Sequence, residues 1–237
     1  MEDISVVIPV YRDDDELSGL LRALDDLPVT EIIIVDGEDR SERPLFHSNP
    51  TQNIIWQTSK RGRGTQIAAG IAVAISPNIW VLHADCRPVP GSHLEIDRLL
   101  ADPKTSMTCF PLAFRTGGLS LSLFALLSRI DSPVTTFGDQ GFAFRKSDYD
   151  GLDLNLSKYP LLEDVALRAA CRKLGRIRKA RINLPTSARR FESLGIWRTQ
   201  FRNISILLKY WRGTSPKTLH AEYYQITRQT APVSRLS

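Results

Sequence analysis

The sequence contains only three cysteines in 237 residues, and none of Cys86, Cys109 and Cys171 has a second cysteine or a histidine at metal-site spacing. We therefore expect reduced thiols in a cytoplasmic protein. A run of 18 apolar residues is also missing, which excludes an ordinary transmembrane helix. The first residues lack the basic and then apolar pattern of a signal peptide, so we expect none.

A strong excess of one charge sign is missing too. Lys and Arg number 31 and Asp and Glu 26, so the net charge of +5 is small and spread along the chain. Such a balance suits phosphate-bearing ligands or an anionic membrane surface, but it is too weak to indicate a nucleic-acid partner. No internal repeat is present, and the length is enough for one sizeable core.

Short β-branched runs alternate with amphipathic stretches over the first hundred residues, a pattern typical of a parallel sheet with covering helices. We expect strands at residues 5–10, 31–35, 53–57 and 79–83, and helices after residues 13–15 and over residues 65–75. Because these strands are nearly continuous in apolar residues, helices should cover both faces of the sheet. Ligands of such sheets bind outside the carboxyl ends of the strands, where Tyr11, Asp36 and Asp85 stand.

The pattern becomes mixed from about Cys109 onward. Residues 119–130 form a helix-like apolar stretch, residues 137–145 a loop that runs into a strand, and residues 161–174 a helix closed by Gly175. A last helix is expected over residues 193–212, with apolar residues at spacings of three and four beside several cations. We expect this helix to pack on its own domain, with an anionic membrane surface as the alternative partner. The same two alternatives, packing on the domain or on an anionic membrane surface, apply to residues 119–130.

The strongest local signal is the apolar run that starts at Trp80 and ends in His83, Ala84 and Asp85. A carboxylate at the carboxyl end of a strand is well placed to hold a divalent cation against a diphosphate, because Mg²⁺ takes one or two protein carboxylates with phosphate oxygens and water. The alternative is that Asp85 only caps the following turn.

Five ordered blocks of this sequence together resemble the family 2 glycosyltransferases. The resemblance covers about residues 4–192, and the small bacterial members with His-Ala-Asp and Gly-Asp-Gln-Gly blocks are the most similar. The blocks are Val7 to Tyr11, Ile33 to Gly37, Arg61 to Gln66, Leu82 to Asp85, and Leu162 to Asp164.

This resemblance implies an α/β fold of the GT-A type, with a Rossmann-like, mostly parallel sheet and helices on both faces. It also implies a nucleoside diphosphate sugar as donor, a divalent cation (Mg²⁺ or Mn²⁺) and transfer with inversion. We expect one catalytic domain over residues 1–237, with a donor half at 1–110, an acceptor half at 111–192 and a C-terminal helical extension at 193–237. The acceptor is unknown, with a lipid-linked acceptor as one option.

The resemblance assigns the donor site residue by residue. Pro9 and Tyr11 border the nucleoside, and Asp36 bonds the base or the ribose. Arg63, just before the helix expected at residue 65, faces the nucleotide together with Arg61. An arginine beside a helix N-terminus supplies fixed positive charge for a diphosphate, and the alternative is a solvated basic turn.

The sequence departs from the family at the metal motif, which is commonly Asp-x-Asp. Here His83 holds the first position. If the strand continues that far, His83 and Asp85 project to the same side, and His83 contacts the ribose or reaches the metal through water. We expect the metal to bind at Asp85, and more weakly than with two carboxylates.

Glu163 and Asp164 stand at the start of an expected helix, where the helix dipole stabilises negative charge. The acid in this block is the general base of the resembled family. We assign that role to Asp164, with Glu163 as second candidate. A helix-capping carboxylate is the alternative reading of both.

The remaining candidates lie on the acceptor side. Asp139 and Gln140, between two glycines, are assigned to acceptor or sugar contacts, with a plain turn as the alternative. One of Arg189 and Arg190 is assigned to the departing diphosphate, with a solvated surface as the alternative. Trp197, in the block that follows, joins this group.

Two other function classes stay open. A noncatalytic nucleotide-sugar binding or scaffold protein is suggested by His83 in place of an aspartate. A sugar nucleotidyltransferase is disfavoured, because such enzymes have a glycine-rich loop directly after the first strand and this chain has none there.

Overall fold

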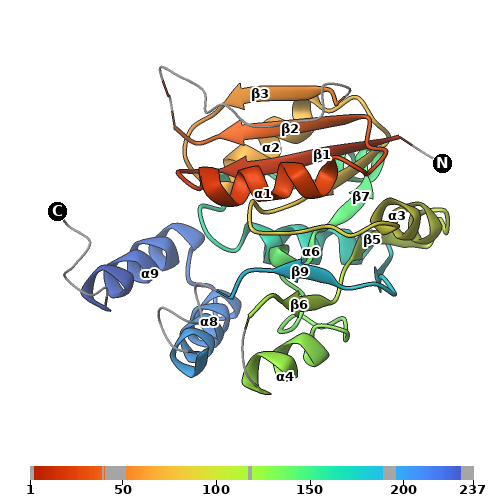
Figure 1. Cartoon of the computed structure of the whole chain (residues 1–237). Helices are drawn as coiled ribbons and strands as arrows, with labels where there is room; N and C mark the ends of the chain where they lie inside the picture. Colours follow the sequence, from red (N-terminus) through yellow and green to blue (C-terminus); the bar gives the residue numbers. More distant parts are fainter. Residues whose placement is uncertain (1–2, 39, 41–51, 117–118, 189–195, 231–237) are drawn as a thin grey trace.

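The centre of the molecule is a seven-stranded sheet with the order β3-β2-β1-β4-β7-β5-β8 (Figure 1). The structure, a computed structural model, describes residues 3–38, 40, 52–116, 119–188 and 196–230. Four strands at one side are parallel, β7 runs antiparallel to both its neighbours, and β5 pairs with β8 in parallel. The strands are β1 (Ile4–Val10), β2 (Glu31–Asp36), β3 (Ile54–Thr58), β4 (Asn78–Val81), β5 (Thr105–Cys109), β7 (Ala143–Arg145) and β8 (Arg176–Lys179).

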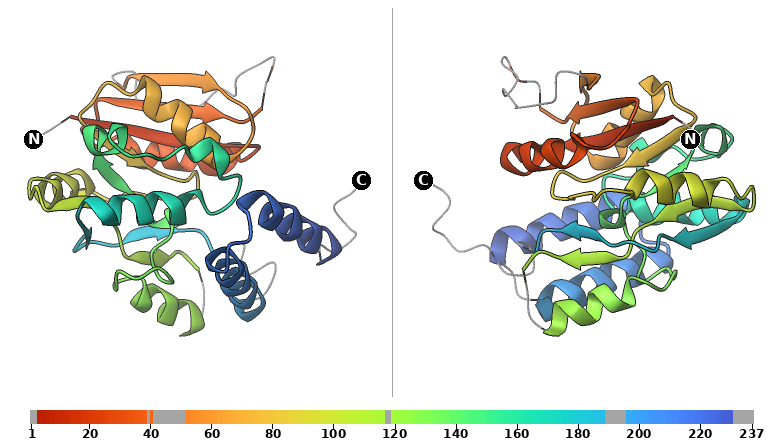
Figure 2. Two further views of the ribbon diagram at one scale, coloured as in Figure 1. Left: turned by 180° about the vertical axis from the view of Figure 1, so that it is seen from behind. Right: turned by 45° about the vertical axis from the view of Figure 1, so that its right-hand side comes forward.

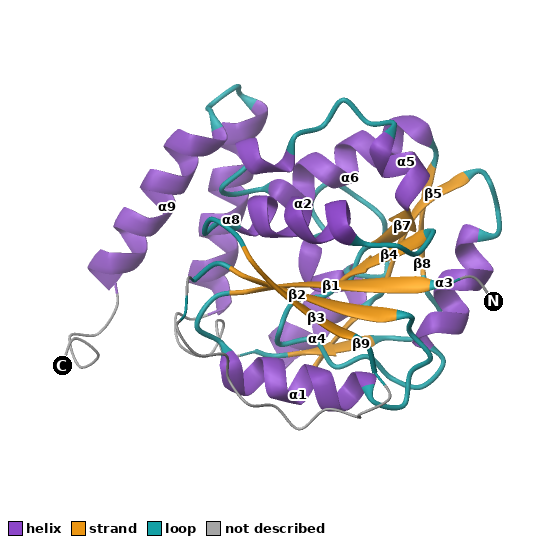
Figure 3. Cartoon of the chain, turned by 90° about the horizontal axis from the view of Figure 1, so that it is seen from above, coloured by secondary structure: helices purple, strands orange, loops and turns teal. Residues whose placement is uncertain are grey.

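Helices cover both faces of this sheet, as predicted. The helices α1 (Asp14–Leu24) and α3 (Ser92–Leu100) share one apolar cluster with the sheet, whereas α2 (Arg63–Val73) and α6 (Glu163–Leu174) share the other. Figure 3 shows α1 on one side of β1, and α2 with α6 on the opposite side. The short α5 (Lys146–Asp150) follows β7. The fold is therefore α/β and Rossmann-like.

Side-chain alternation along β1 explains the two clusters. Val6 and Ile8 belong to the cluster of α1, and Val7 belongs to the cluster of α2. All three side chains are buried, and each contributes about 1.5–3 kcal/mol of hydrophobic stabilisation. An apolar run without alternation is what a strand covered on both faces requires.

A second layer continues the chain beyond the large sheet. It contains the parallel pair β6 (Leu112–Phe114) and β9 (Leu184–Thr186), and the helices α4 (Leu119–Leu127), α8 (Ile196–Trp211) and α9 (Pro216–Thr230). Both views of Figure 2 show α4 and α8 at the end of the molecule farthest from β3. No helix in the described ranges is both long enough and apolar enough to cross a bilayer.

Candidate active site

The turn after β4 carries the first group of predicted site residues. Strand β4 ends at Val81, two residues before the predicted end, so His83 and Asp85 lie in a turn and the argument from strand periodicity is wrong. The turn is closed by a hydrogen bond from Cys86 N to His83 O (3.0 Å). Asp85 is partly buried, and burial together with the charge of Asp139 raises its pKa, against the influence of His83.

Arg87 stabilises the turn that carries Asp85 through hydrogen bonds to its carbonyl oxygens. Its guanidinium donates to the carbonyl oxygens of Ala84 (2.9 Å) and Cys86 (2.7 Å) and forms an ion pair with Glu16 of α1. Glu16 also pairs with Arg115 (2.9 Å), so two cations share one buried carboxylate. These partners are far apart in the sequence, and no local pattern predicts them.

The imidazole of His83 is paired with the carboxylate of Asp139, at 2.9 Å between Nδ1 and Oδ1. Burial opposes protonation of His83, but the hydrogen bond and the charges of Asp139 and Asp85 outweigh it, so its pKa is raised. The thiol of Cys86 lies 3.6 Å from the Asp139 carbonyl oxygen. Asp139 is therefore held against the turn that carries Asp85, and half of its side-chain surface (51%) stays exposed.

Gly138 joins this turn to the start of α6. Its amide donates to Asp164 Oδ2 at 2.8 Å. A Cβ at this position would lie 3.2 Å from the Asp164 Cβ and 3.2 Å from both Cε1 and Nε2 of His83. Only glycine therefore fits without movement of one of these neighbours. The 3-10 turn η1 (Gly138–Gln140), the end of β4 and the N-terminus of α6 converge here.

Glu163 is buried beside this point, with 1% of its side chain exposed, and forms an ion pair with Arg63 at 2.6 Å. Burial raises the pKa of Glu163, and Arg63 opposes that rise. Helix α2 begins at Arg63 rather than at residue 65, so Arg63 is a first-turn helical residue. In the structure its guanidinium is engaged by Glu163. Of the two carboxylates, Asp164 is the more accessible one.

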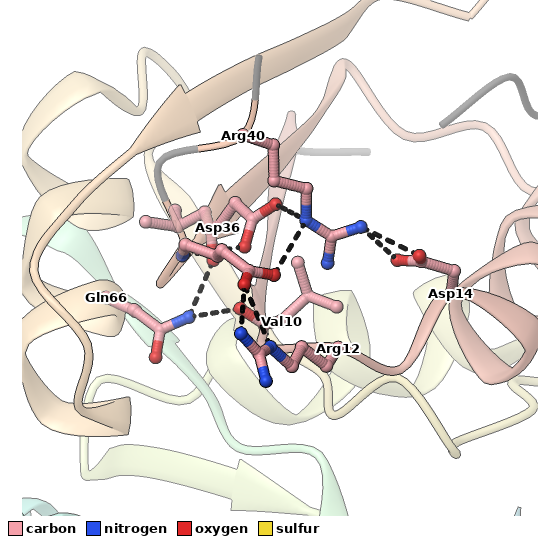
Figure 4. Close-up of polar contacts among 8 residues, drawn as sticks. Val10, Arg12, Asp14, Asp36, Arg40 and Gln66 are labelled. Atoms are coloured by element: carbon pink, nitrogen blue, oxygen red, sulfur yellow. Dashed lines mark hydrogen bonds and ion pairs between the residues drawn. The ribbon is translucent and has the colours of Figure 1, made fainter. Parts of the chain in front are cut away.

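A second polar group lies at the carboxyl ends of β1 and β2 (Figure 4). Asp36 is fully buried; its carboxylate accepts a hydrogen bond from Glu38 N (3.0 Å) and pairs with Arg40 Nε (2.9 Å). Burial raises the pKa of Asp36, against these two partners. Gln66 of α2 bridges the strands, because its amide donates to the carbonyl oxygens of Val10 (2.6 Å) and Val35 (2.8 Å).

Two other predicted donor residues, Pro9 within β1 and Tyr11 directly after it, differ in exposure. Tyr11 is partly exposed, and the guanidinium carbons of Arg61 and Arg12 lie 4.2 Å and 5.3 Å from its ring centroid. This arrangement gives an aromatic face with two cations near the strand end. Pro9, by contrast, is buried within β1, so its side chain does not line an open surface.

Gln140 points inward rather than toward an acceptor. Its side chain is 1% exposed; its amide nitrogen donates to Thr135 O, and its amide oxygen accepts from Lys179. Burial lowers the pKa of Lys179. Gln140 thus supports the η1 turn from inside, and no pattern in the sequence indicates its partner Lys179. Arg189 and Arg190 lie outside the described residues, as does the side chain of Trp197.

The donor set at the β4 turn fits a divalent cation of the Mg²⁺ or Mn²⁺ type. Asp85 and Asp139 are near enough that the charge of Asp139 raises the pKa of Asp85, a repulsion that a cation would relieve. Within the described ranges no three His, Cys, Asp or Glu side chains form a complete metal cage. Mg²⁺ does not need one, because phosphate oxygens and water supply its other ligands.

Comparison with known proteins identifies the family of this chain. The sequence model of the family described as "Glycosyl transferase family 2" matches residues 5–137. No curated protein matches the sequence significantly.

Three solved structures have the same fold at low identity. S. aureus TarS has a TM-score of 0.60 at 14% identity, over 86% of this chain, which spans only 40% of that protein. S. aureus TarS 1–349 in complex with UDP-GlcNAc has 0.59 at 13%, over 78% of this chain and 58% of that one. The mannosyltransferase PcManGT from Pyrobaculum calidifontis, in complex with GDP-Man and Mn²⁺, has 0.60 at 16%, over 94% of this chain and 71% of that one. These likenesses show a GT-A fold.

Proposed function

The chain belongs to glycosyltransferase family 2, and on that premise we propose that it transfers a sugar from a nucleoside diphosphate sugar to an acceptor hydroxyl. The observation that carries the proposal is the position of Gly138. A side chain there would touch both His83, in the turn of Asp85, and Asp164, the candidate base. The turn that carries Asp85, the candidate for the metal and the diphosphate, and the carboxylate of Asp164, the candidate base, therefore lie on two sides of Gly138.

We assign the donor to residues 1–110 and the acceptor side to residues 111–192, with a helical extension over 193–237. Tyr11 and Arg61 offer a ring and a cation at the end of β1, where ligands of such sheets bind. Asp36 and Pro9 are buried in the structure and act by shaping the strand ends. The UDP-GlcNAc and GDP-Man bound by the two similar structures support a nucleoside diphosphate sugar.

Asp85 and Asp139 are the residues that would hold a divalent cation, and His83 orients Asp139 through its Nδ1 contact. Such a cation, when bound, supplies positive charge to the leaving diphosphate. The Mn²⁺ bound by the similar mannosyltransferase supports the use of a divalent cation.

The reaction is a single displacement. Asp164 accepts the proton of the acceptor hydroxyl, the hydroxyl oxygen attacks C1 of the sugar, and the bond from C1 to the diphosphate oxygen breaks with its electron pair on the diphosphate. Attack from the face opposite the leaving group inverts the anomeric configuration. The hydrogen bond from Gly138 N to Asp164 Oδ2 fixes the carboxylate for this role.

Arg61 and one of Arg189 and Arg190 complete the charge around the diphosphate in this proposal, and Trp197 belongs to the acceptor side. Arg63 is paired with Glu163, so in this proposal it acts on the diphosphate site only indirectly. The ion pair fixes the first turn of α2. A cytoplasmic location remains a prediction from the sequence.

Donor hydrolysis tests the proposal, because water can replace the unknown acceptor. The wild-type chain with Mn²⁺ should release nucleoside diphosphate from one of UDP-, GDP- or dTDP-sugars. Asp164→Asn should lower this rate by about 10² to 10⁴. Asp153→Asn, at an exposed carboxylate, is the matched control and should keep it.

A noncatalytic nucleotide-sugar binding protein is the second candidate, favoured by His83 at the place of the first aspartate. This second candidate predicts donor binding without release of nucleoside diphosphate from any sugar nucleotide in the same assay.

For the proposed glycosyltransferase, release of nucleoside diphosphate that is unchanged in Asp164→Asn would contradict the assignment of Asp164 as the base.

A further inference from the structure

Exposed apolar side chains gather on one side of α8. Phe201, Ile204, Leu208 and Trp211 recur at spacings of three and four, which places them on one stripe of the helix. Between 42% and 69% of each side chain is exposed. Contiguous exposed apolar side chains of this kind mark sites of interaction with proteins or membranes.

A second group lies on α4 and the residues after it. The exposed apolar side chains here are Leu123, Leu126, Leu127, Ile130 and Val134. Together the two groups, which we name the α4/α8 face, hold nine of the thirteen exposed large apolar side chains among the described residues. Figures 1 and 2 show both helices at the same end of the molecule.

The fold does not need the exposed stripe of α8, because the helix is fixed through its other side. Ile206 is buried against Leu219 and Tyr223 of α9, and Leu161 and Leu162 pack on the same cluster. The sequence predicts that this helix packs on its own domain. That prediction holds for the side of α8 that carries Ile206, and the exposed stripe lies on another side. Leu161 and Leu162 directly precede Glu163 and Asp164, so α8 is held next to the candidate base.

The α4/α8 face has an excess of positive charge. Residues 119–134 and 196–212 contain one acid, Asp131, which forms an ion pair with Arg168 of α6, and five cations: Arg129, Arg198, Arg202, Lys209 and Arg212. Lys209 forms an ion pair with Glu222 of α9, and Arg202 donates a hydrogen bond to the hydroxyl oxygen of Tyr223 at 3.0 Å. Arg129, which precedes Ile130, and Arg212, which follows Trp211, are both exposed.

We propose that the α4/α8 face binds the surface of an anionic phospholipid bilayer. Exposed Phe, Leu and Trp side chains enter the interface between headgroups and acyl chains, while Arg129 and Arg212 meet the lipid phosphates. The helices lie on the membrane and do not span it. Because α8 packs beside the residues before Asp164, this docking brings the acceptor side of the site to the lipid surface.

Vesicle flotation tests the proposal without any measurement of transfer, so its outcome is independent of the proposed reaction. The full chain should float with vesicles of 70% phosphatidylcholine and 30% phosphatidylglycerol and bind pure phosphatidylcholine at least about tenfold less. The double variant Phe201→Ser/Leu208→Ser should lose binding by about tenfold or more. Arg129→Glu/Arg212→Glu should lose the preference for the anionic vesicles.

The matched control is Ile75→Ser/Leu94→Ser, which removes two apolar side chains that are at least as exposed but lie outside the α4/α8 face, and it should leave binding unchanged. Circular dichroism of all variants checks that they fold. The proposal is overturned if the wild-type chain does not float, or if both double Ser variants bind equally. It is also overturned if light scattering shows a dimer that Phe201→Ser/Leu208→Ser dissociates, because the face then binds a second copy.

Discussion

His83 Nδ1 lies 2.9 Å from Asp139 Oδ1, which ties the turn after β4 to a carboxylate 56 residues later in the chain. The residue at the first position of the metal motif is thus paired with an acid from η1. The motif itself contains one carboxylate, Asp85. The pair of His83 with Asp139 brings the Asp139 carboxylate near enough to act on the charge of Asp85. The His83 substitution is accordingly compatible with a metal-assisted donor site.

Asp139→Asn should weaken Mn²⁺ binding in the presence of nucleoside diphosphate by at least about 10- to 100-fold, because it removes a proposed ligand and the loss of a residue that only orients a ligand already has an effect of this size. The amide keeps the size of the side chain and removes its charge. Isothermal titration with Mn²⁺ measures the change, and Asp153→Asn provides the control. Equal Mn²⁺ affinities for wild type and Asp139→Asn would show that Asp139 has no part in the metal site.

Gly138→Ala should lower kcat by about tenfold or more, with a smaller effect on donor affinity. The added Cβ would meet Asp164 and His83 at 3.2 Å, so one of them must move, and a misplaced base loses much of its effect. Gly151→Ala is the matched control, because its Cβ meets only carbonyl oxygens at an ordinary 3.6 Å. Steady-state donor hydrolysis gives both constants, and an unchanged kcat in Gly138→Ala would contradict the proposed geometry.

Gln66→Leu should lower the free energy of unfolding by about 1 to 3 kcal/mol, because it removes the buried amide donor of Val35 O and one of the two donors of Val10 O, which keeps its bond from Gly37 N. Urea unfolding measures this difference. Gln57→Leu, in the partly exposed β3, should change stability by less than about 0.5 kcal/mol. A loss no larger than that of the control would mean that the bridge between β1 and β2 contributes little.

Glu163 should make stability depend on pH. Its pKa is raised by burial above the ordinary 4.5, so the folded chain binds more protons than the unfolded chain between these two values. Its contribution to stability therefore falls as pH rises from 4.5 through the raised pKa. The Glu163→Gln variant has no carboxyl group to titrate at this position, so it lacks this decrease in stability with pH. The charged neighbours Arg63, Asp164 and His83 are the same in both proteins.

Urea unfolding of both proteins across that pH range checks this prediction. The difference in free energy of unfolding, wild type minus Glu163→Gln, should decrease as the pH increases. A difference that increases would mean that Arg63 holds the pKa of Glu163 below its ordinary value.

The first half of the fold was predictable because its signals are local. The strands β1 and β2 are continuous apolar runs, and the leucines of α1 lie at helical spacing, so burial and periodicity agree. The strands β5 (TSMTC) and β8 (RIRK) were not predicted. Both are short and contain few large apolar residues, and their pairing is a long-range contact.

The second C-terminal helix was also missed. Gly213 adopts a φ of 92°, which ends α8, and Pro216 then begins α9 at a position where its missing amide costs nothing. These two residues are the sequence signal for the second helix.

In the site, the types of the residues that follow each strand could be predicted from the sequence. The partners of Arg63, Gln140 and Arg87 could not, because side-chain pairs between distant segments leave no pattern in one sequence.

The most direct test of the account is a thermal-shift measurement of the wild-type chain and Asp85→Asn with UDP-, GDP- and dTDP-sugars, with and without Mn²⁺. At 100 times its dissociation constant a ligand adds about 2.7 kcal/mol of stability. We predict that one nucleotide sugar stabilises the wild-type chain only with Mn²⁺, and that Asp85→Asn loses this response. Stabilisation that is the same in both proteins, or that needs no metal, would contradict the assignment of Asp85 to the metal and diphosphate.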